Sequence, residues 1–483
     1  MIPMTLAALA AATGGELRLA DPAAVITGTV EYDSRKVTAG GLFIALSGDR
    51  FDGHDFAAGA VAAGVVAVLA TRPLEVPSIL VPDALVALAK LARAVVDRLP
   101  QLTIVGVTGS SGKTSTKDLI AALAARLGPT VAPPESFNNE LGHPWTVLRA
   151  DEDTRYLVLE KSARGVGHIR WLTDIAPPRI GVVLNVGTAH VGEFGSLEVT
   201  AQAKGELVEA LPADGVAVLN ADDHRVRAMA GRTKARVVLV GLAPDASVRA
   251  ENVSLDAVGR PGFTLVTPAG SAEVVLGLYG EHHVGNALAA AAVGLELGLP
   301  LAEVVTTLAG ARPCSRRRME VTERADGVTV VDDSYNANPD SMRAALKALR
   351  AMAGTTAGAL PTGKPGDEPR GRRRVWAVLG AMGELGESSR EQHDALGRLA
   401  VRLDIDRLVV VGPEAGGIHA GAVLEGSWGE ESVHVPDVDA AVRLLNERVA
   451  PGDVVLVKAS RAARLDRVAD ALLAVPTAGG GRA

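Results

Sequence analysis

The chain has 483 residues, 48% of them hydrophobic, and its formal net charge is −7 at pH 7. This length predicts about three domains, and the hydrophobic fraction is ample for packed cores. Acidic and basic residues are interspersed along the chain, which argues against a nucleic-acid-binding surface. Cys314 is the single cysteine, so an internal disulfide framework is excluded and a reducing compartment is favoured.

The N-terminal stretch is apolar but has no basic residue before Arg18, and it predicts a short helix over residues 5–12 instead of a signal peptide. The longest uncharged apolar run covers residues 56–71 and is interrupted by Gly59 and Gly64. It falls short of the roughly 18–20 residues that span a bilayer. We therefore expect a cytoplasmic protein without membrane insertion.

Residues 1–99 predict a small α/β domain. Polar residues cluster near the ends of its short predicted strands, where they could grip a ligand: Ser34, Arg35, Asp52 and His54. Turn formation is the alternative explanation for these residues, and from the sequence alone it is the preferred one.

A phosphate-binding loop is predicted between the apolar run 102–107 and a helical pattern that follows Lys117. The loop residues are Thr108, Gly109, Ser110, Ser111, Gly112, Lys113 and Thr114. Lys113 would reach the β- and γ-phosphates of a nucleotide, and the Thr114 hydroxyl would bind Mg²⁺. Val107 stands where the strict motif has glycine, so the loop is a variant of that motif. An ordinary strand–turn–helix corner is the alternative.

The rest of residues 100–312 predicts a mostly parallel sheet. Continuous apolar runs at 156–159, 180–184, 216–219 and 237–240 are typical of parallel strands buried on both faces. Residues 250–278 alternate around a Gly-Arg-Pro-Gly turn and predict an antiparallel hairpin. Residues 286–297 predict a helix.

Residues 313–483 predict a third domain with a Rossmann-like, doubly wound pattern. Its buried strands are expected at 328–331, 375–379, 408–411 and 454–457. Residues 354–374 are rich in Gly, Pro and Arg and predict a surface loop. Its end, Arg372–Arg374, could be a phosphate site, but a solvated loop edge is the preferred interpretation.

Three polar residues in the middle domain follow or flank predicted strands. Glu160 ends the run 156–159, His190 follows the run 180–186, and Lys204 is expected to open a helix. Because ligands bind at the carboxyl ends of parallel strands, Glu160 and His190 should share a rim with the phosphate-binding loop. They could hold a second metal ion there, although each residue alone is more often structural.

The motifs together resemble those of the Mur ligases of peptidoglycan synthesis, and the resemblance covers essentially the whole chain. The matching segments are Asp33–Arg35, Asp52–His54, Thr108–Thr114, Ser136–Gly142, Asn185–His190, Ala203–Glu206, Gly280–Asn286, Arg318–Glu320 and Asp332–Pro339. The last segment is the most specific. It resembles the family member that adds D-alanyl-D-alanine, and the Asp-Asn-Pro-Arg signature of the preceding diamino-acid-adding member is absent from the sequence.

The resemblance implies an α/β protein of three domains: a UDP-sugar-binding domain, an ATPase domain, and a domain that closes over ATP and carries the incoming dipeptide. It also implies a monomer that ligates D-alanyl-D-alanine to UDP-N-acetylmuramoyl-tripeptide at the expense of ATP, through an acyl phosphate and with two Mg²⁺ ions. Thr114 and Glu160 would bind one Mg²⁺, and His190 with a carbamylated Lys204 the second. By the same resemblance, ATP would be held by Lys113 and the loop, His282, Asn286, Arg318, Asp333 and Asn336, and the UDP-sugar substrate by Ser34, Arg35, Asp52, His54, Asn138 and Asn139.

Three residues depart from the family pattern: Lys161 after Glu160, Ala381, and His283. Strand alternation should turn Lys161 away from the metal-binding face, toward packed helices. Two rival functions remain: a related ligase of the superfamily, such as a polyglutamate ligase, and a P-loop binding switch. The predicted first domain argues against a polyglutamate ligase. A switch would explain Lys113 but not Glu160, His190, Lys204 and Asp333 together.

Overall fold

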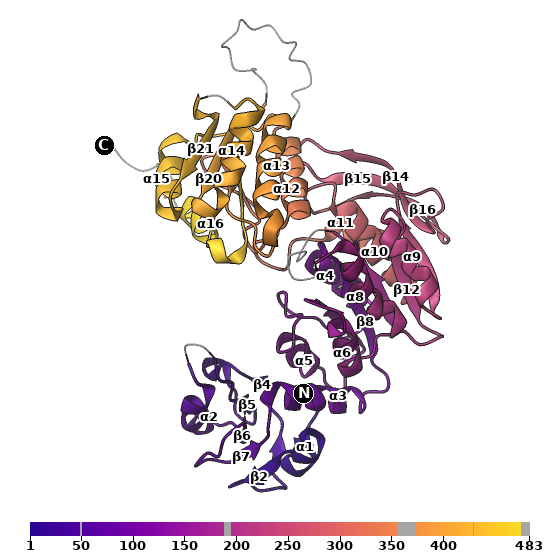
Figure 1. Ribbon diagram of the computed structural model, residues 1–483. Coiled ribbons are helices and arrows are strands. Elements are labelled where there is room, and N and C mark those ends of the chain that lie inside the picture. The colour runs from indigo at the N-terminus through magenta and orange to yellow at the C-terminus, as the bar shows by residue number, and fades with distance from the viewer. Residues whose placement is uncertain (49–50, 188–194, 355–371, 428, 475–483) are drawn as a thin grey trace, which may run out of the picture.

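The computed structural model describes residues 1–48, 51–187, 195–354, 372–427 and 429–474. Figure 1 shows three α/β units that follow one another along the chain, with the first and third at opposite ends of the molecule. Each unit is built around its own sheet. The architecture predicted from the sequence, with mostly parallel sheets, is confirmed.

The first unit has a five-stranded sheet of order β2-β7-β6-β5-β4, in which only the β2–β7 pair is antiparallel. A short antiparallel pair, β1–β3, lies beside it. The elements are β1 (Met4–Thr5), α1 (Leu6–Thr13), β2 (Glu16–Arg18), β3 (Val25–Ile26), β4 (Val30–Glu31), the 3₁₀ turn η1 (Ser34–Lys36), β5 (Leu42–Ile44), the 3₁₀ turn η2 (Gly53–Phe56), α2 (Ala57–Ala62), β6 (Ala67–Ala70), β7 (Ser78–Leu80) and α3 (Ala84–Val96). Helix α1 is the short N-terminal helix that the sequence predicts.

The middle unit has a sheet of order β16-β15-β14-β13-β12-β11-β8-β10-β9, parallel from β9 to β14. Its strands are β8 (Thr103–Thr108), β9 (Thr130–Val131), β10 (Tyr156–Glu160), β11 (Ile180–Val183), β12 (Val216–Asn220), β13 (Arg236–Gly241), β14 (Val248–Leu255), β15 (Pro261–Thr267) and β16 (Gly270–Val275). Its helices are α4 (Lys113–Ala124), α5 (Gly142–Val147), α6 (His168–Ile175), α8 (Leu197–Glu209), α9 (His224–Ala228), α10 (His283–Glu296) and α11 (Leu301–Gly310). The predicted hairpin is therefore part of a three-stranded antiparallel extension of the same sheet.

The third unit has a sheet of order β17-β18-β22-β19-β20-β21, in which only the β17–β18 pair is antiparallel. Its elements are β17 (Glu320–Glu323), β18 (Thr329–Asp332), α12 (Pro339–Met352), β19 (Val375–Leu379), α13 (Ser389–Arg402), β20 (Arg407–Val411), α14 (Gly416–Glu425), β21 (Ser432–Val435), α15 (Val438–Arg448), β22 (Val454–Lys458), the 3₁₀ turn η7 (Arg461–Ala463) and α16 (Asp466–Leu473). Two buried apolar clusters occur in this unit, and between them they take residues from each of its parallel strands. The doubly wound pattern is thereby confirmed.

The predicted domain boundaries fall between elements of different sheets. The boundary at 99/100 lies between α3 and β8, and the boundary at 312/313 lies between α11 and β17. One hydrophobic cluster nevertheless crosses the first boundary, since it joins Leu88 and Leu91 of α3 to Leu157 of β10. The domain boundaries near residues 99 and 312 thus stay a prediction.

The interpretation of Arg372–Arg374 as a solvated loop edge is wrong. Arg372 forms an ion pair with Asp406 at 2.7 Å, and Arg374 forms one with Asp453 at 2.7 Å while its guanidinium lies over the Trp376 ring. Arg373 donates to the Thr329 hydroxyl and to backbone carbonyls. These guanidiniums are engaged at the ends of neighbouring strands and are not available as a phosphate site.

Within the described residues, no helix combines the length and the apolar character that crossing a bilayer requires.

Candidate active site

The phosphate-binding loop leaves β8 and enters α4 at Lys113. The Asn185 side-chain oxygen accepts from the amides of Ser110 at 2.8 Å and Ser111 at 2.9 Å, and so fixes the loop. Gly112 has φ +79°, and a Cβ there would lie 2.5 Å from the Asn286 side-chain oxygen, so this turn needs glycine. Because Asn185 occupies the two serine amides, the first turn of α4 is the part of the cradle left to receive an anion.

Of two loop side chains predicted to bind the nucleotide, Lys113 lines the central cavity and Thr108 does not. The Lys113 amine donates to the Gly109 carbonyl at 2.7 Å and lines the central cavity, where desolvation lowers its pKa. An incoming phosphate would replace that carbonyl as its partner. The Thr108 hydroxyl instead donates to the Lys161 carbonyl at 2.8 Å and is fully buried. It therefore supports the strand below the loop and does not reach the cavity.

The Glu160 carboxylate stands at the end of β10, next to the loop. One of its oxygens accepts from the Ser136 hydroxyl at 3.1 Å and from the Asn138 amide at 3.0 Å, and Ser136 also bonds the Thr114 hydroxyl at 2.8 Å. The other oxygen, Oε1, is buried and has no hydrogen-bond partner in the described structure. A carboxylate oxygen left unsatisfied beside a threonine hydroxyl matches the oxygen ligands of Mg²⁺. These residues fit the metal that the sequence predicts.

Lys204 lies within α8, which begins at Leu197, so the prediction that Lys204 opens a helix is wrong. Its side chain is buried, and desolvation together with the nearby Lys113 lowers its pKa well below the usual value. The alternative of a surface lysine paired with Glu206 or Glu209 is excluded by burial. Glu206 accepts from the amides of Gly167 and Arg170, and Glu209 pairs with Arg170 and Arg232.

His190, predicted as a ligand of the second metal, lies outside the described residues. Across the described ranges, no group of three or more His, Cys, Asp and Glu side chains gathers as a metal cluster. The environment of Lys204 is therefore the structural information that bears on the second site.

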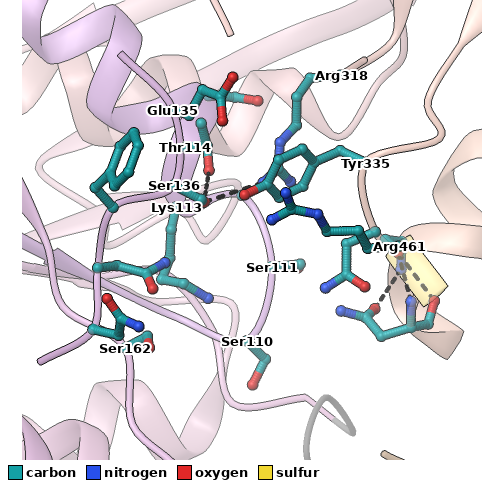
Figure 2. A pocket seen from close by; sticks show the side chains of 18 of the residues that line it. Ser110, Ser111, Lys113, Thr114, Glu135, Ser136, Ser162, Arg318, Tyr335 and Arg461 are labelled. Atoms are coloured by element: carbon teal, nitrogen blue, oxygen red, sulfur yellow. Dashed lines mark hydrogen bonds between the residues drawn. The ribbon is translucent and has the colours of Figure 1, made fainter. Parts of the chain in front are cut away.

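The third unit contributes the opposite wall (Figure 2). Arg318 donates to the Ser136 hydroxyl at 3.2 Å, and its guanidinium lies 4.2 Å from the centre of the Tyr335 ring. Asp333 forms a buried ion pair with Lys458 at 2.6 Å, and the Lys458 amine also donates to the Asn336 carbonyl at 2.9 Å. Ser136 thus connects the loop threonine, the Glu160 carboxylate and the third unit.

The predicted adenine-binding residues come from the start of α10. The rings of His282 and His283 lie 4.3 Å apart, and His283 is within 3.3 Å of the Asn286 amide. Burial lowers the pKa of His283 well below its usual value, so the ring is neutral near pH 7. Asn286 also abuts Gly112, which places it against the phosphate-binding loop.

These walls enclose a cavity of about 680 Å³ lined by residues of all three units. The predicted site residues that it brings together are Ser110, Ser111, Gly112, Lys113, Thr114, Asn138, Asn139, His282, Asn286, Arg318, Asp333 and Asn336. Tyr32 represents the first unit, which docks through Trp145, whose indole donates to the Val30 carbonyl at 2.9 Å. The predicted residues that do not line it are Thr108, Gly109, Glu160, Lys204, Ser34, Arg35, Asp52 and His54.

The four predicted site residues of the first unit, Ser34, Arg35, Asp52 and His54, lie in or beside 3₁₀ turns and form local contacts. Asp33 caps η1 and pairs with the exposed Arg35. His54 is buried and bonds the Asp52 carboxylate at 2.5 Å, which lowers the pKa of Asp52 to about 2. Its other ring nitrogen accepts from the Thr71 amide at 3.0 Å. Their predicted contacts with a UDP-sugar stay a proposal.

Five residues at the site have no role predicted from the sequence: Ser136, Asn185, Tyr335, Lys458 and Arg461. Three of them lie inside recognised motifs, and that position was an available signal. Lys458 is the last residue of β22 and Arg461 comes shortly after it, at the carboxyl end of a parallel strand where ligands bind.

Lys161, directly after Glu160, sends its side chain to the other side of the sheet. Its amine donates to the Leu172 carbonyl at 3.0 Å and the Ala176 carbonyl at 3.3 Å, at the C-terminal end of α6, and approaches His143 at 3.4 Å. The side chain is fully buried, and desolvation lowers its pKa well below the usual value. It therefore takes no part in metal binding.

This fold and this cavity define a nucleotide-dependent ligase architecture, and family models match along most of the chain. Residues 27–104 match the model described as Mur ligase family, catalytic domain; residues 107–294 match the Mur ligase middle domain; and residues 317–461 match the Mur ligase, glutamate ligase domain. The chain belongs to the Mur ligase family.

Two curated relatives are similar over nearly the full length of both chains. The UDP-N-acetylmuramoyl-tripeptide--D-alanyl-D-alanine ligase of Mycobacterium tuberculosis is 54% identical over 99% of each chain. The enzyme of the same name from Escherichia coli K12 is 36% identical over 98% of this chain and 99% of its own.

Solved structures of the same type are similar as well. A crystal structure of MurF from Acinetobacter baumannii has a TM-score of 0.84 and 31% identity, covering 98% of this chain and 99% of its own. The MurF ligase of Thermotoga maritima in complex with ADP has a TM-score of 0.77 and 31% identity, covering 92% and 97%.

Proposed function

We propose that this chain is an ATP-dependent ligase that adds D-alanyl-D-alanine to UDP-N-acetylmuramoyl-tripeptide in peptidoglycan precursor synthesis. The observation that carries the proposal is the Ser136 junction, where the loop hydroxyl of Thr114, the Glu160 carboxylate and the third-unit Arg318 converge. A phosphate cradle, a metal-binding carboxylate and a closing cation are what phosphoryl transfer to a carboxylate needs. The similar ligases named above support the choice of substrates.

The reaction forms an amide in two steps. A carboxylate oxygen of the tripeptide attacks the γ-phosphorus of ATP, the bond to ADP breaks, and an acyl phosphate results. The amine of D-alanyl-D-alanine then attacks the acyl carbon, and phosphate and a proton leave. Lys113 and the first turn of α4 hold the phosphates, and Arg318 faces them from the third unit. Mg²⁺, held by Thr114 and Glu160, would supply neutralisation of the charge between the reacting oxygens.

Further parts of the proposal follow the resemblance. His282 and Asn286 contact the adenine side of ATP, and Asp333 and Asn336 contact ATP from the third domain. Ser34, Arg35, Asp52, His54, Asn138 and Asn139 bind the UDP-sugar peptide. The three domains end near residues 99 and 312, and the protein acts as a monomer in the cytoplasm.

A second Mg²⁺ would be held by His190 and by Lys204 in carbamylated form. The burial of Lys204 beside Lys113 supports this, because both effects favour the neutral amine. The neutral amine adds CO₂ and loses one proton, and the product is an anion where an ammonium would have repelled the metal. No Asp or Glu forms an ion pair with this side chain in the described structure.

The test is ATP-dependent phosphate release with UDP-N-acetylmuramoyl-tripeptide and D-alanyl-D-alanine, each also omitted in turn. We expect release only when both are present, together with formation of the pentapeptide product. Equal release without the dipeptide would favour a P-loop switch. Ligation of glutamate to a folate, with no activity on the peptide pair, would favour the polyglutamate ligase.

A further inference from the structure

The cationic side chains of the central cavity differ in whether they already have an ion-pair or hydrogen-bond partner. Lys458 is paired with Asp333, Lys113 bonds a loop carbonyl, and Arg318 bonds the Ser136 hydroxyl. Arg461, on η7 just after β22, is exposed and lines the same cavity. In the described parts of the chain its guanidinium makes no ion pair with a carboxylate, and its recorded contact is the Tyr335 ring, 5.9 Å away.

Tyr335 separates two guanidiniums with different surroundings. Arg318 lies over the ring at 4.2 Å and reaches the Ser136 junction, so it belongs to the phosphate side. Figure 2 shows Arg461 extending from the third unit to the same ring. Contact with an aromatic ring restrains a guanidinium and leaves its N–H edge able to donate to a planar anion.

The proposed reaction brings three anionic groups into this cavity: the triphosphate, the carboxylate that is activated, and the C-terminal carboxylate of the dipeptide. The first two have partners in the loop, Glu160 with its metal, and Arg318. The third has none among these groups. An extended dipeptide spans about 7 Å, so a cation that holds its carboxylate must stand a short distance from the reaction centre, on the wall where the acceptor enters.

We propose that Arg461 binds the C-terminal carboxylate of the incoming D-alanyl-D-alanine, with Tyr335 holding the guanidinium in place. The proposal rests on the proposed function and names the acceptor-binding residue within it. A guanidinium and a carboxylate form two parallel hydrogen bonds, which fix the orientation of the dipeptide as well as its position. Arg461 therefore makes a free carboxylate a requirement for the acceptor and directs the amine at the other end toward the acyl phosphate.

The experiment measures ligation by the full-length wild type, Arg461→Gln and Arg461→Lys, with D-alanyl-D-alanine and with its C-terminal amide. We expect Arg461→Gln to raise the KM for D-alanyl-D-alanine about 10- to 100-fold, as expected for a lost hydrogen bond to a charged group, with the KM for ATP changed less than about twofold. Arg461→Lys keeps the charge but loses the two parallel hydrogen bonds of the guanidinium, so its KM for D-alanyl-D-alanine should lie between those of wild type and Arg461→Gln. Wild type should prefer the acid over the amide by a similar factor, and Arg461→Gln should lose that preference.

The matched control is Arg467→Gln, which removes an exposed arginine of α16, the helix that follows η7. Arg467 pairs with Asp439 and does not line the cavity, so its variant should keep the wild-type KM for the dipeptide. An unchanged dipeptide KM in Arg461→Gln, or a rise in the KM for ATP alone, would overturn the assignment and point to phosphate binding. Failure of wild type to ligate would overturn the proposed function and this assignment with it.

Discussion

Glu160 and Lys161 are consecutive residues whose charged groups lie on opposite sides of the middle sheet. The carboxylate meets Ser136 and Asn138 near the cavity, whereas the amine is buried against the end of α6. Strand alternation causes the separation, since neighbouring side chains point to opposite faces. A cation next to a metal-binding carboxylate is thus compatible with activity.

We predict that Lys161→Met ligates within about threefold of wild type. Methionine keeps most of the volume but removes the donor to the Leu172 and Ala176 carbonyls, which should lower the free energy of unfolding by about 1–3 kcal/mol. Lys161→Ala, by contrast, leaves a cavity and should lower the free energy of unfolding by about 2–5 kcal/mol. Urea unfolding and ligation rates of both variants measure this, and a large loss of activity in a stable Lys161→Met would show that the amine serves the site.

We also predict how the stability difference between wild type and Lys161→Met depends on pH. The pKa of Lys161 is lowered in the folded state. Between this lowered pKa and the unfolded value of about 10.4, the unfolded chain therefore binds one proton more than the folded chain. Stability then rises with pH in this window, by at most about 1.4 kcal/mol per unit. Between pH 7 and 10 wild type should gain on Lys161→Met, while a constant difference between their unfolding free energies would contradict a lowered pKa.

The sequence was sufficient where the pattern is local. The buried strands β10, β11 and β12 follow from continuous apolar runs, and the loop before α4 follows from its glycines and Lys113. The start of α8 was also readable, because Ser196 caps the helix by accepting from the Val199 amide, a signal that the prediction overlooked.

Other parts depend on residues that meet only in three dimensions. Arg374 looked like part of a charged loop because Asp453, its partner, is 79 positions away. Tyr335 and Arg461 come together from two strand ends of one sheet, and no local pattern announces their contact. The role of Asn185 as holder of the loop amides is equally a matter of tertiary structure.

We predict that Lys113→Ala lowers turnover at least about 100-fold, as expected when a catalytic electrostatic group is removed, while the fold remains intact. The amine bonds one loop carbonyl and supports no hydrophobic core, so the melting temperature should shift by only a few degrees. Phosphate release with both substrates and a thermal melt make the measurement. Near-normal release in a folded variant would remove the loop from the nucleotide site.

We predict that Glu160→Gln weakens the apparent affinity of the enzyme for the Mg²⁺ that ligation requires. The amide keeps the shape of the carboxylate but offers its metal one neutral oxygen, and it loses the charge that balances the ion. The Mg²⁺ concentration for half-maximal rate should rise at least about tenfold, and kcat should fall. Glu140→Gln is the control, because Glu140 lines the same cavity and its nearest ion-pair partner is His168, 3.8 Å away. Equal Mg²⁺ titrations for wild type and Glu160→Gln would exclude Glu160 as a ligand.

The last prediction concerns the carbamate on Lys204. Arginine keeps the positive charge and much of the length of lysine but is not carbamylated in this way, so Lys204→Arg should ligate at least about 100-fold more slowly than wild type. Wild type supplied with ¹³C-bicarbonate should show a carbamate carbon signal by NMR that Lys204→Arg lacks. The NMR signal separates two explanations of a slow variant. If wild type shows the signal, the variant is slow because the carbamate is lost; if wild type shows none, the variant is slow because its packing has changed.

Lys234→Arg supplies the matched control, since Lys234 lies just before β13, outside the cavity lining, and should tolerate the same exchange without loss of rate. If Lys204→Arg ligates at the wild-type rate, the carbamate is not needed. The proposed second Mg²⁺ site then lacks its anionic ligand. If the rate falls but wild type shows no carbamate signal, the larger guanidinium has disturbed the packing around this buried position, and the carbamate assignment is contradicted.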